Sequence, residues 1–376
     1  MRVIDQGIAV KAEANTDHSS CAFSGIAVLP GGRWLCGFRA APKKKESDGQ
    51  HAMLTWSDDG GKTWRAPFTP FTPPVLDGKP GLFRCANLTA LGGRRVLCTL
   101  YWQDYSDPSL PFFNEETEGL LDSYLYFSFS EDSGETWSSP RLLDTTPYNV
   151  PTPTTGPTLV LPNGEWALQF ETNKHYYDRT PWQHASVLMF TRDEGRSFPE
   201  YAVIASDPNR RYFWWDQRPG MLADGTLLDL FWTYDNVDAV YLNIHARASK
   251  DNGRTWTELW DTGVPGQPAA PVSLPDGGIA MVYMDRTAAP TVKLRRSADG
   301  GRTWPETTEL ILFEPPTPPQ TVAKGSMQDC WNEMEKFSTG LPATARLPNG
   351  DVLVLFYSGP YADLTDIRWV RVGGNH

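Results

Sequence analysis

The sequence predicts an all-β fold, a propeller of six four-stranded antiparallel blades, from two interleaved repeats and from the strand-like runs at both chain ends. The first repeat is the phrase Ser/Thr-x-Asp-x-Gly-x-Thr/Ser-Trp/Phe, which occurs five times, beginning at Ser57, Ser130, Thr191, Ser249 and Ser297. Such a phrase does not recur by chance, so the chain is built from copies of one small unit. In each copy the Asp can accept hydrogen bonds in a tight turn, the Gly can take a positive φ, and the aromatic ring can wedge between sheets.

The second repeat predicts the number of blades. It consists of an apolar run, a glycine-bearing turn and another apolar run, and it occurs six times, around Gly32, Gly93, Gly164, Gly225, Gly277 and Gly350. Asn-Gly, Asp-Gly and Gly-Gly between such runs are typical of β-hairpins. Each hairpin is therefore predicted to supply the two inner strands of one blade.

The chain ends account for the missing sixth Asp phrase. Residues 2–10 and 367–372 both read as strands, and the last blade has no Asp phrase after it. We therefore expect the last blade to take its outer strand from the start of the chain, which makes residues 1–376 a single domain closed as a ring by its two terminal strands.

The amino-acid composition and the net charge argue against several classes of protein and of partner. The chain has no run of about 20 apolar residues, so no membrane partner is expected. Its formal charge of −11 argues against a nucleic-acid partner. Five cysteines, an odd number, match neither a disulfide framework nor a zinc module. No metal or cofactor is predicted, and the thiols favour a cytoplasmic protein, or a secreted one if a leader peptide is removed from the sequence as given.

The functional side chains are predicted on the face where loops enter the first strand and leave the second strand of each blade. Asp216 and Glu333 are the predicted acid and base, because each lies beside a tryptophan, and apolar surface raises the pKa of a carboxyl group. The alternative is that both acids only pair with neighbouring arginines. The predicted substrate-binding residues can bond to sugar oxygens or stack on a sugar ring: Arg39, Arg84, His175, Trp215, Arg218, Asp285 and Arg286. The run Lys43 to Lys45 is predicted to be a solvated loop.

The five Asp phrases resemble the Asp-box repeats of the sialidase superfamily, whose catalytic domain is a six-bladed β-propeller. The resemblance covers essentially the whole chain, and it implies that the boxes lie on the face away from the active site. Arg39 matches an arginine of the family at the end of a second strand, Asp48 matches its acid/base aspartate, and Arg218-Pro219 is similar to an arginine that enters an inner strand. The stretch SCAFSGIAV lacks the family's first arginine, and its tyrosine nucleophile and glutamate partner have no clear match.

The resemblance implies a glycoside hydrolase that acts on a carbohydrate, possibly an acidic sugar. Carboxylates, arginines and aromatic rings on one face are what hydrolysis of a sugar bond needs. If Asp216 and Glu333 carry no proton transfer, the next candidates are Asp48 and Glu171. Two alternatives stay open: a polysaccharide lyase on a uronate-containing glycan, served by His175, Tyr176 and Arg179, and a non-catalytic glycan-binding propeller. The sequence carries no signal of the linkage or of the oligomeric state.

Overall fold

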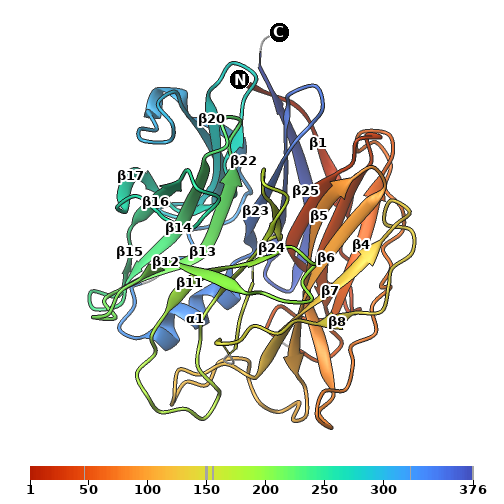
Figure 1. The fold of residues 1–376 in the computed structure, drawn as a ribbon, viewed down its shortest axis with the longest axis vertical. Helices are drawn as coiled ribbons and strands as arrows, with labels where there is room; N and C mark the ends of the chain where they lie inside the picture. The colour runs from red at the N-terminus through yellow and green to blue at the C-terminus, as the bar shows by residue number, and fades with distance from the viewer. Residues whose placement is uncertain (46, 149–150, 155, 322, 375–376) are drawn as a thin grey trace.

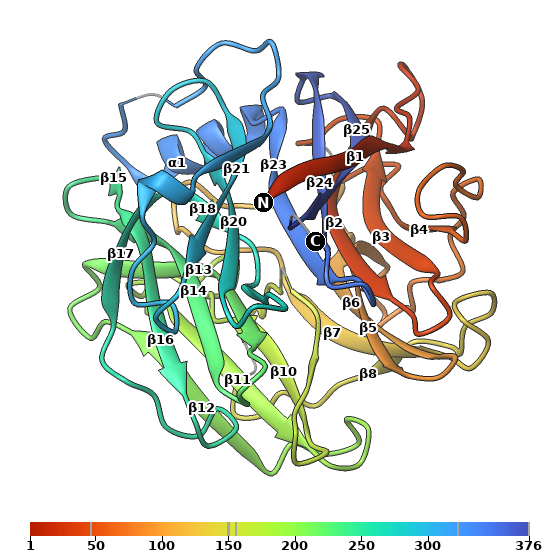
Figure 2. The same ribbon diagram turned by 90° about the horizontal axis from the view of Figure 1, so that it is seen from above.

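β-Sheets arranged around a central axis make up almost the whole molecule (Figures 1 and 2). The structure is a computed structural model, and it describes residues 1–45, 47–148, 151–154, 156–321 and 323–374. Within these residues there are 25 strands, one α-helix, α1 (Met327–Lys336), and one 3₁₀ turn, η1 (Glu306–Thr308). None of the helical segments in the described ranges has the length and apolar character to cross a membrane.

Four of the five sheets are separate blades with a four-stranded antiparallel path. The first blade contains β5 (Gly81–Gly92), β6 (Arg95–Asp104), β7 (Ser123–Ser130) and β8 (Arg141–Leu142). The second contains β9 (Leu159–Val160), β10 (Trp166–Glu171), β11 (Ala185–Thr191) and β12 (Glu200–Ser206). The third contains β13 (Tyr212–Met221), β14 (Leu227–Asp235), β16 (Asn243–Ser249) and β17 (Trp260–Pro265), and the short strand β15 (Val240–Tyr241) pairs with β14. The fourth contains β18 (Gln267–Pro268), β20 (Ile279–Asp285), β21 (Thr291–Ser297) and β22 (Leu310–Phe313), and the short strand β19 (Val272–Ser273) pairs with β20.

The fifth sheet has seven strands and joins the beginning of the chain to its end. Its strands are β23 (Thr339–Arg346), β24 (Val352–Tyr361), β25 (Leu364–Gly373), β2 (Ser20–Val28), β3 (Trp34–Ala41) and β4 (His51–Ser57), with β1 (Arg2–Val10) on β25. β1 and β25 are antiparallel, from the pair of Arg2 with Gly373 to the pair of Val10 with Ile367. The two terminal strands of the chain therefore lie side by side in one sheet (Figure 1).

The prediction of six separate four-stranded blades is wrong, since the structure has four. The physical reason is a parallel link between β2 and β25, where Ser20 pairs with Thr365. Thr365 N–H donates to Ser19 O at 3.1 Å, and Thr365 Oγ1 donates to Cys21 O at 2.7 Å. These bonds merge the first and last repeat units into one sheet. Beyond β4, the outer position holds one isolated bridge, from Leu54 to Phe68, in place of a fourth strand.

The five repeated phrases are turns that follow the third strand of their units, as the sequence predicts. In the copy after β7, the hydroxyl of Ser130 and the N–H of Thr136 donate to Asp132 Oδ1 at 2.8 and 2.9 Å. Gly134 takes a φ of 91°, and Trp137 Nε1 donates to its carbonyl at 3.0 Å. The other four copies repeat the bonds to the Asp, so each phrase forms its turn largely from its own residues.

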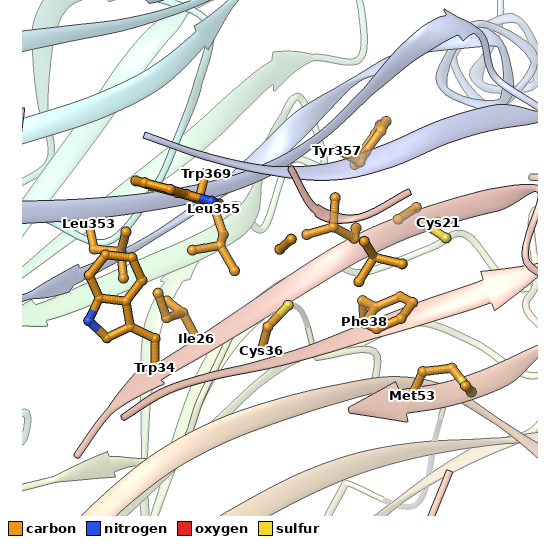
Figure 3. Close-up of a cluster of buried hydrophobic side chains, with 14 of the residues drawn as sticks. Cys21, Ile26, Trp34, Cys36, Phe38, Met53, Leu353, Leu355, Tyr357 and Trp369 are labelled. Atoms are coloured by element: carbon orange, nitrogen blue, oxygen red, sulfur yellow. The ribbon is translucent and has the colours of Figure 1, made fainter. Parts of the chain in front are cut away.

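The apolar core is divided into clusters that lie between neighbouring repeat units. Figure 3 shows the cluster between the β2–β3 hairpin and the β24–β25 hairpin, where Trp34 meets Trp369 at a ring-centroid distance of 5.4 Å and an angle of 71°. Cys21 and Cys36 are buried in the same cluster. All five cysteines are free and buried.

Deletion of residues 1–10 should remove a whole strand from the edge of the seven-stranded sheet. We expect the truncated protein to lose a cooperative unfolding transition or to aggregate, because the side of β25 that faces β1 would be left unpaired. Circular dichroism melting and size-exclusion chromatography measure both effects. A truncated protein with unchanged melting would show that the terminal pairing adds no stability.

Acid should destabilise the fold through the Asp boxes. Burial alone would raise the pKa of Asp132, but hydrogen bonds from Thr136 and Ser130 outweigh it and bring the pKa to about 2, and the pKa of Asp299 is also about 2. Because these values are lowered on folding, the stabilisation is complete above about pH 4 and is lost as the pH falls toward 2. The double variant Asp132→Asn, Asp299→Asn should show a smaller drop in Tm over this range than the exposed control Asp17→Asn. An equal drop in Tm in the double variant and in the control would contradict the role of the Asp boxes in acid sensitivity.

Candidate functional site

A cavity of about 260 Å³ lies where the inner strands of the sheets converge. Its lining includes residues from β2, β5, β13, β18 and β23, each the first strand of its repeat unit. These residues lie from the first part to the middle of the inner strands, whereas the Asp boxes follow the far ends of the third strands. Because neighbouring strands are antiparallel, the cavity and the boxes lie on opposite faces, as the resemblance to sialidases implies.

Four inner strands are bulged where they meet the cavity. The pairing register shifts between Ala22 and Gly25 in β2, Phe83 and Cys85 in β5, Trp215 and Arg218 in β13, and Gly340 and Ala343 in β23. Extra residues in these bulges, Phe23, Arg84, Asp216 and Leu341, line the cavity. Phe23, Asp216 and Leu341 have φ values of 55°, 49° and 46°, a region that costs energy for residues other than glycine. The bulges therefore re-aim side chains into the site.

Asp216 presents its carboxylate to the cavity from the bulge in β13. Gln267 Nε2 donates to Asp216 Oδ2, and Arg218 Nη2 lies 3.9 Å from Asp216 Oδ1. Gln267 Oε1 in turn accepts from Arg286 Nη1 at 2.9 Å. Asp216, Arg218 and Arg286, all predicted on one face, thus lie around one cavity.

Glu171, at the end of β10, is the second carboxyl group close to Asp216. Its Oε2 lies 3.5 Å from His184 Nε2, and its Oε1 accepts from the backbone N–H of Gln217 at 3.3 Å. Burial raises the pKa of Glu171; the contact with His184 lowers it, and the charge of Asp216 raises it further. The net result is a raised pKa, so Glu171 can hold a proton where an exposed glutamate would have lost it.

Three guanidinium groups line the cavity. Arg84 lies over the ring of Phe112 at 4.2 Å, and Arg286 over the ring of Phe337 at 3.9 Å. Arg218 Nε donates to the carbonyl of Pro268 at 3.3 Å. Arg84, Arg218 and Arg286 were all predicted substrate-binding residues, and the structure brings them to one cavity together with Trp215.

Lys44 contradicts the prediction that the lysine run is solvated. It lines the cavity with 7% of its surface exposed, and its Nζ donates to the carbonyls of Met334 and Phe337 at 2.7 and 2.6 Å. A third contact joins Nζ to the hydroxyl of Tyr357 at 3.1 Å. Burial lowers the pKa of Lys44. The C-terminal end of α1 presents backbone carbonyl groups, to which the amino group of a lysine can donate, and these contacts draw Lys44 inward.

Glu333 does not line the cavity. The segment predicted to be an entering loop is the helix α1, which begins after the N-cap Ser326, whose hydroxyl accepts from Asp329 N–H. The buried side of α1 includes Glu333, which pairs with Lys324 Nζ at 3.1 Å. Glu335 is the acid of this helix that lines the cavity, and it pairs with Lys45 at 3.0 Å.

Arg39, Asp48, His175 and Asp285 are the other predicted site residues that the structure leaves outside the cavity lining. Their polar contacts are Arg39 Nε with Gln50 at 2.8 Å, Asp48 with the hydroxyl of Tyr105 at 2.7 Å, His175 with Asp122 at 2.7 Å, and Asp285 with Lys293 at 2.9 Å. Tyr176 and Arg179, predicted for a lyase, also lie outside the lining.

Aromatic rings form one wall of the cavity. Trp331 of α1 stacks on Phe113 at a centroid distance of 4.8 Å and an angle of 19°, and Trp215 stacks on Tyr234 at 4.9 Å and 12°. Phe113, Trp215 and Trp331 all line the cavity. The site therefore combines a charged floor with a flat apolar wall, an arrangement suited to a sugar ring, which has polar edges and an apolar face.

A known protein family also matches this chain. Residues 100–312 match the family of the BNR repeat-like domain. The chain belongs to this family. No curated protein matches the chain. Among the residues that the structure describes, no group of three or more His, Cys, Asp or Glu side chains is placed to hold a metal ion.

Solved structures share the fold of this BNR-repeat protein. A protein of unknown function from Dyadobacter fermentans aligns with 100% of this chain and 99% of its own, at 18% identity and a TM-score of 0.76. The NanB sialidase of Streptococcus pneumoniae aligns with 97% of this chain and 70% of its own, at 12% identity and a TM-score of 0.63. An α-L-arabinanase of Penicillium chrysogenum aligns with 99% of this chain and 98% of its own, at 14% and 0.63. At identities this low, the similarity shows the fold alone, which is a sialidase-like propeller.

Replacement of Glu171 should stabilise the protein in a pH-dependent way. A raised pKa means that folding disfavours the charged form of Glu171, so Glu171→Gln should raise Tm at about pH 8 and have little effect at about pH 4. Glu165 in the same blade is the matched control, because its contacts with Asn163 and Arg192 lower its pKa in spite of burial. Glu165→Gln should lower Tm at pH 8. The same change of Tm in both variants would contradict the raised pKa of Glu171 and the lowered pKa of Glu165.

Proposed function

We propose that this protein is a glycoside hydrolase that acts on a glycan carrying an acidic sugar. The observation that carries the proposal is the meeting of two carboxyl groups in different environments, Asp216 and Glu171, inside one cavity lined by guanidinium groups and aromatic rings. The solved sialidase and arabinanase that share the fold act on carbohydrates, which agrees with the proposal.

The two carboxyl groups suit the two roles that hydrolysis of a sugar bond requires. One group must protonate the leaving oxygen, and the other must act on the opposite side as a base or nucleophile. Glu171 has the raised pKa of a proton donor. Asp216 accepts from Gln267 and faces Arg218, contacts that a carboxylate makes. We therefore assign Glu171 as the acid and Asp216 as its partner, in place of the predicted pair of Asp216 and Glu333.

The guanidinium groups favour an acidic sugar. A guanidinium group binds a carboxylate or sulfate through paired N–H donors, and burial strengthens such contacts. Arg218 and Arg286 are 6% and 9% exposed, and both lie next to the proposed reacting carboxylates. A carboxylate or sulfate on the sugar would place an opposite charge next to these buried guanidinium groups.

The alternatives predicted from the sequence receive less support. His175, Tyr176 and Arg179 do not line the cavity, so a lyase would need a different base. A non-catalytic glycan-binding protein would not need a glutamate with a raised pKa beside a second acid. A lyase would release an unsaturated uronate, which is detected by its ultraviolet absorbance, and a binding protein would bind the glycan without turnover.

Turnover should depend on Asp216 and Glu171. A panel of aryl glycosides, sialosides and uronate polymers identifies a substrate, and on it we expect Asp216→Asn and Glu171→Gln each to lower kcat by about a hundredfold or more. Glu165→Gln, which changes a buried glutamate just before the start of the same strand, should keep its kcat. Because Glu171 must be protonated to act, the rate of the wild type should fall as the pH rises through the pKa of Glu171. Folded Asp216 and Glu171 variants with wild-type turnover would remove both from the mechanism.

A further inference from the structure

Gln267 lies between two charged side chains in the floor of the cavity. Its Nε2 donates to Asp216 Oδ2, and its Oε1 accepts from Arg286 Nη1 at 2.9 Å. Because a guanidinium group has donors and no acceptor, the oxygen of the amide must face Arg286 and its N–H must face Asp216. Gln267 is 3% exposed, so bulk water does not compete for these contacts.

Arg286 is held in place by contacts other than the one with Gln267. Its Nη2 donates to the carbonyl of Thr339 at 3.0 Å, and its guanidinium group lies 3.9 Å over the ring of Phe337. Gly340 allows this approach, because a side-chain carbon there would collide with Arg286 Nη2. A cation fixed in this way polarises the amide of Gln267 and strengthens its N–H as a donor.

Asp216 needs such support more than a residue in regular strand does. Its φ of 49° places it in a strained bulge, between the register positions of Trp215 and Arg218. The charged and titratable groups that face it come from four elements: Arg218 on β13, Arg286 after β20, Glu171 on β10 and Tyr357 on β24. Within the described residues, Gln267 is the side chain that donates a hydrogen bond to this carboxylate.

We propose that Gln267 is a positioning residue for Asp216, which it holds through Oδ2 so that Oδ1 is left to face the bound sugar. The hydrogen bond stabilises the charged form of the carboxylate. Asp216 is then kept as a base or charge-stabilising group, and the proton is left to Glu171. The contact itself follows from the structure, and its effect on turnover rests on the proposed glycoside hydrolysis.

The contact can be tested without any substrate. In protein labelled with ¹⁵N-glutamine, Gln267→Met identifies the side-chain amide resonance of Gln267 by its disappearance. We expect that resonance to move in Asp216→Asn at neutral pH, because the charged acceptor is gone, and the resonance of Gln50 to stay in place. Gln50 is the matched control, since it is a buried glutamine that accepts from a buried arginine, Arg39, outside the cavity lining. A Gln267 resonance that does not move in Asp216→Asn overturns the proposal.

The role in turnover is tested with the aryl glycoside or sialoside that the wild type hydrolyses. Gln267→Met, which keeps the length of the side chain but makes no hydrogen bond, should lower kcat by about tenfold. KM should change much less than kcat, because the variant removes the support of Asp216. Gln50→Met should lower Tm and leave kcat unchanged.

The outcomes of the two tests separate this inference from the proposed function. A Gln267→Met variant that loses only stability, as Gln50→Met does, overturns the positioning role. A wild type that hydrolyses no member of the panel overturns the proposed function, while the amide resonance still decides whether Gln267 holds Asp216. Gln267→Asn, with the same amide on a shorter chain, is the second variant if Gln267→Met does not fold, and it should show the same loss of kcat with little change of KM.

Discussion

The position of β25 is the constraint on which the rest of the structure depends. It pairs with β24 on one side and with β1 on the other, and at its first residues Thr365 also pairs with Ser20 of β2. One strand thus ties the last repeat unit to the first and holds both chain ends. In a radial fold each sheet packs only on its neighbours, so a break here would separate the two sides of the cavity, Phe23 on β2 and Leu341 on β23.

The parts of the fold that the sequence predicts correctly are those whose cause is local. An Asp box bonds to its own backbone, and a glycine turn between two apolar runs makes a hairpin with few alternatives, so both are legible in one stretch of residues. The merging of the first and last units was missed because its cause is a contact between Ser20 and Thr365, which are distant in the sequence. For the same reason the bulge that re-aims Asp216 left no signal, since it depends on register with β14.

The residues of the candidate site show the same difference between local and distant causes. Arg84, Asp216, Arg218 and Arg286 were predicted from their place at strand ends, and they line the cavity. Glu333 was misplaced because the segment was interpreted as a loop. In a helix, residues two positions apart point about 200° from one another, so Glu333 turns to Lys324 while Glu335 meets the cavity. The signal that reveals the helix is Ser326 followed by Asp329, which together begin α1 as N-cap and first-turn acid.

The cavity and the whole protein differ in the sign of their charge. The chain carries a formal charge of −11, yet Arg84, Arg218 and Arg286 line the cavity, and one of the acids near them, Glu171, has a raised pKa. Salt screens exposed charges beyond about 8 to 10 Å, but it screens the buried arginines much less. A long polyanion would therefore meet repulsion along the outer surface before any of its sugars reached the arginines. One acidic residue at the end of a short or otherwise neutral glycan would meet the attraction of the cavity with little of that repulsion.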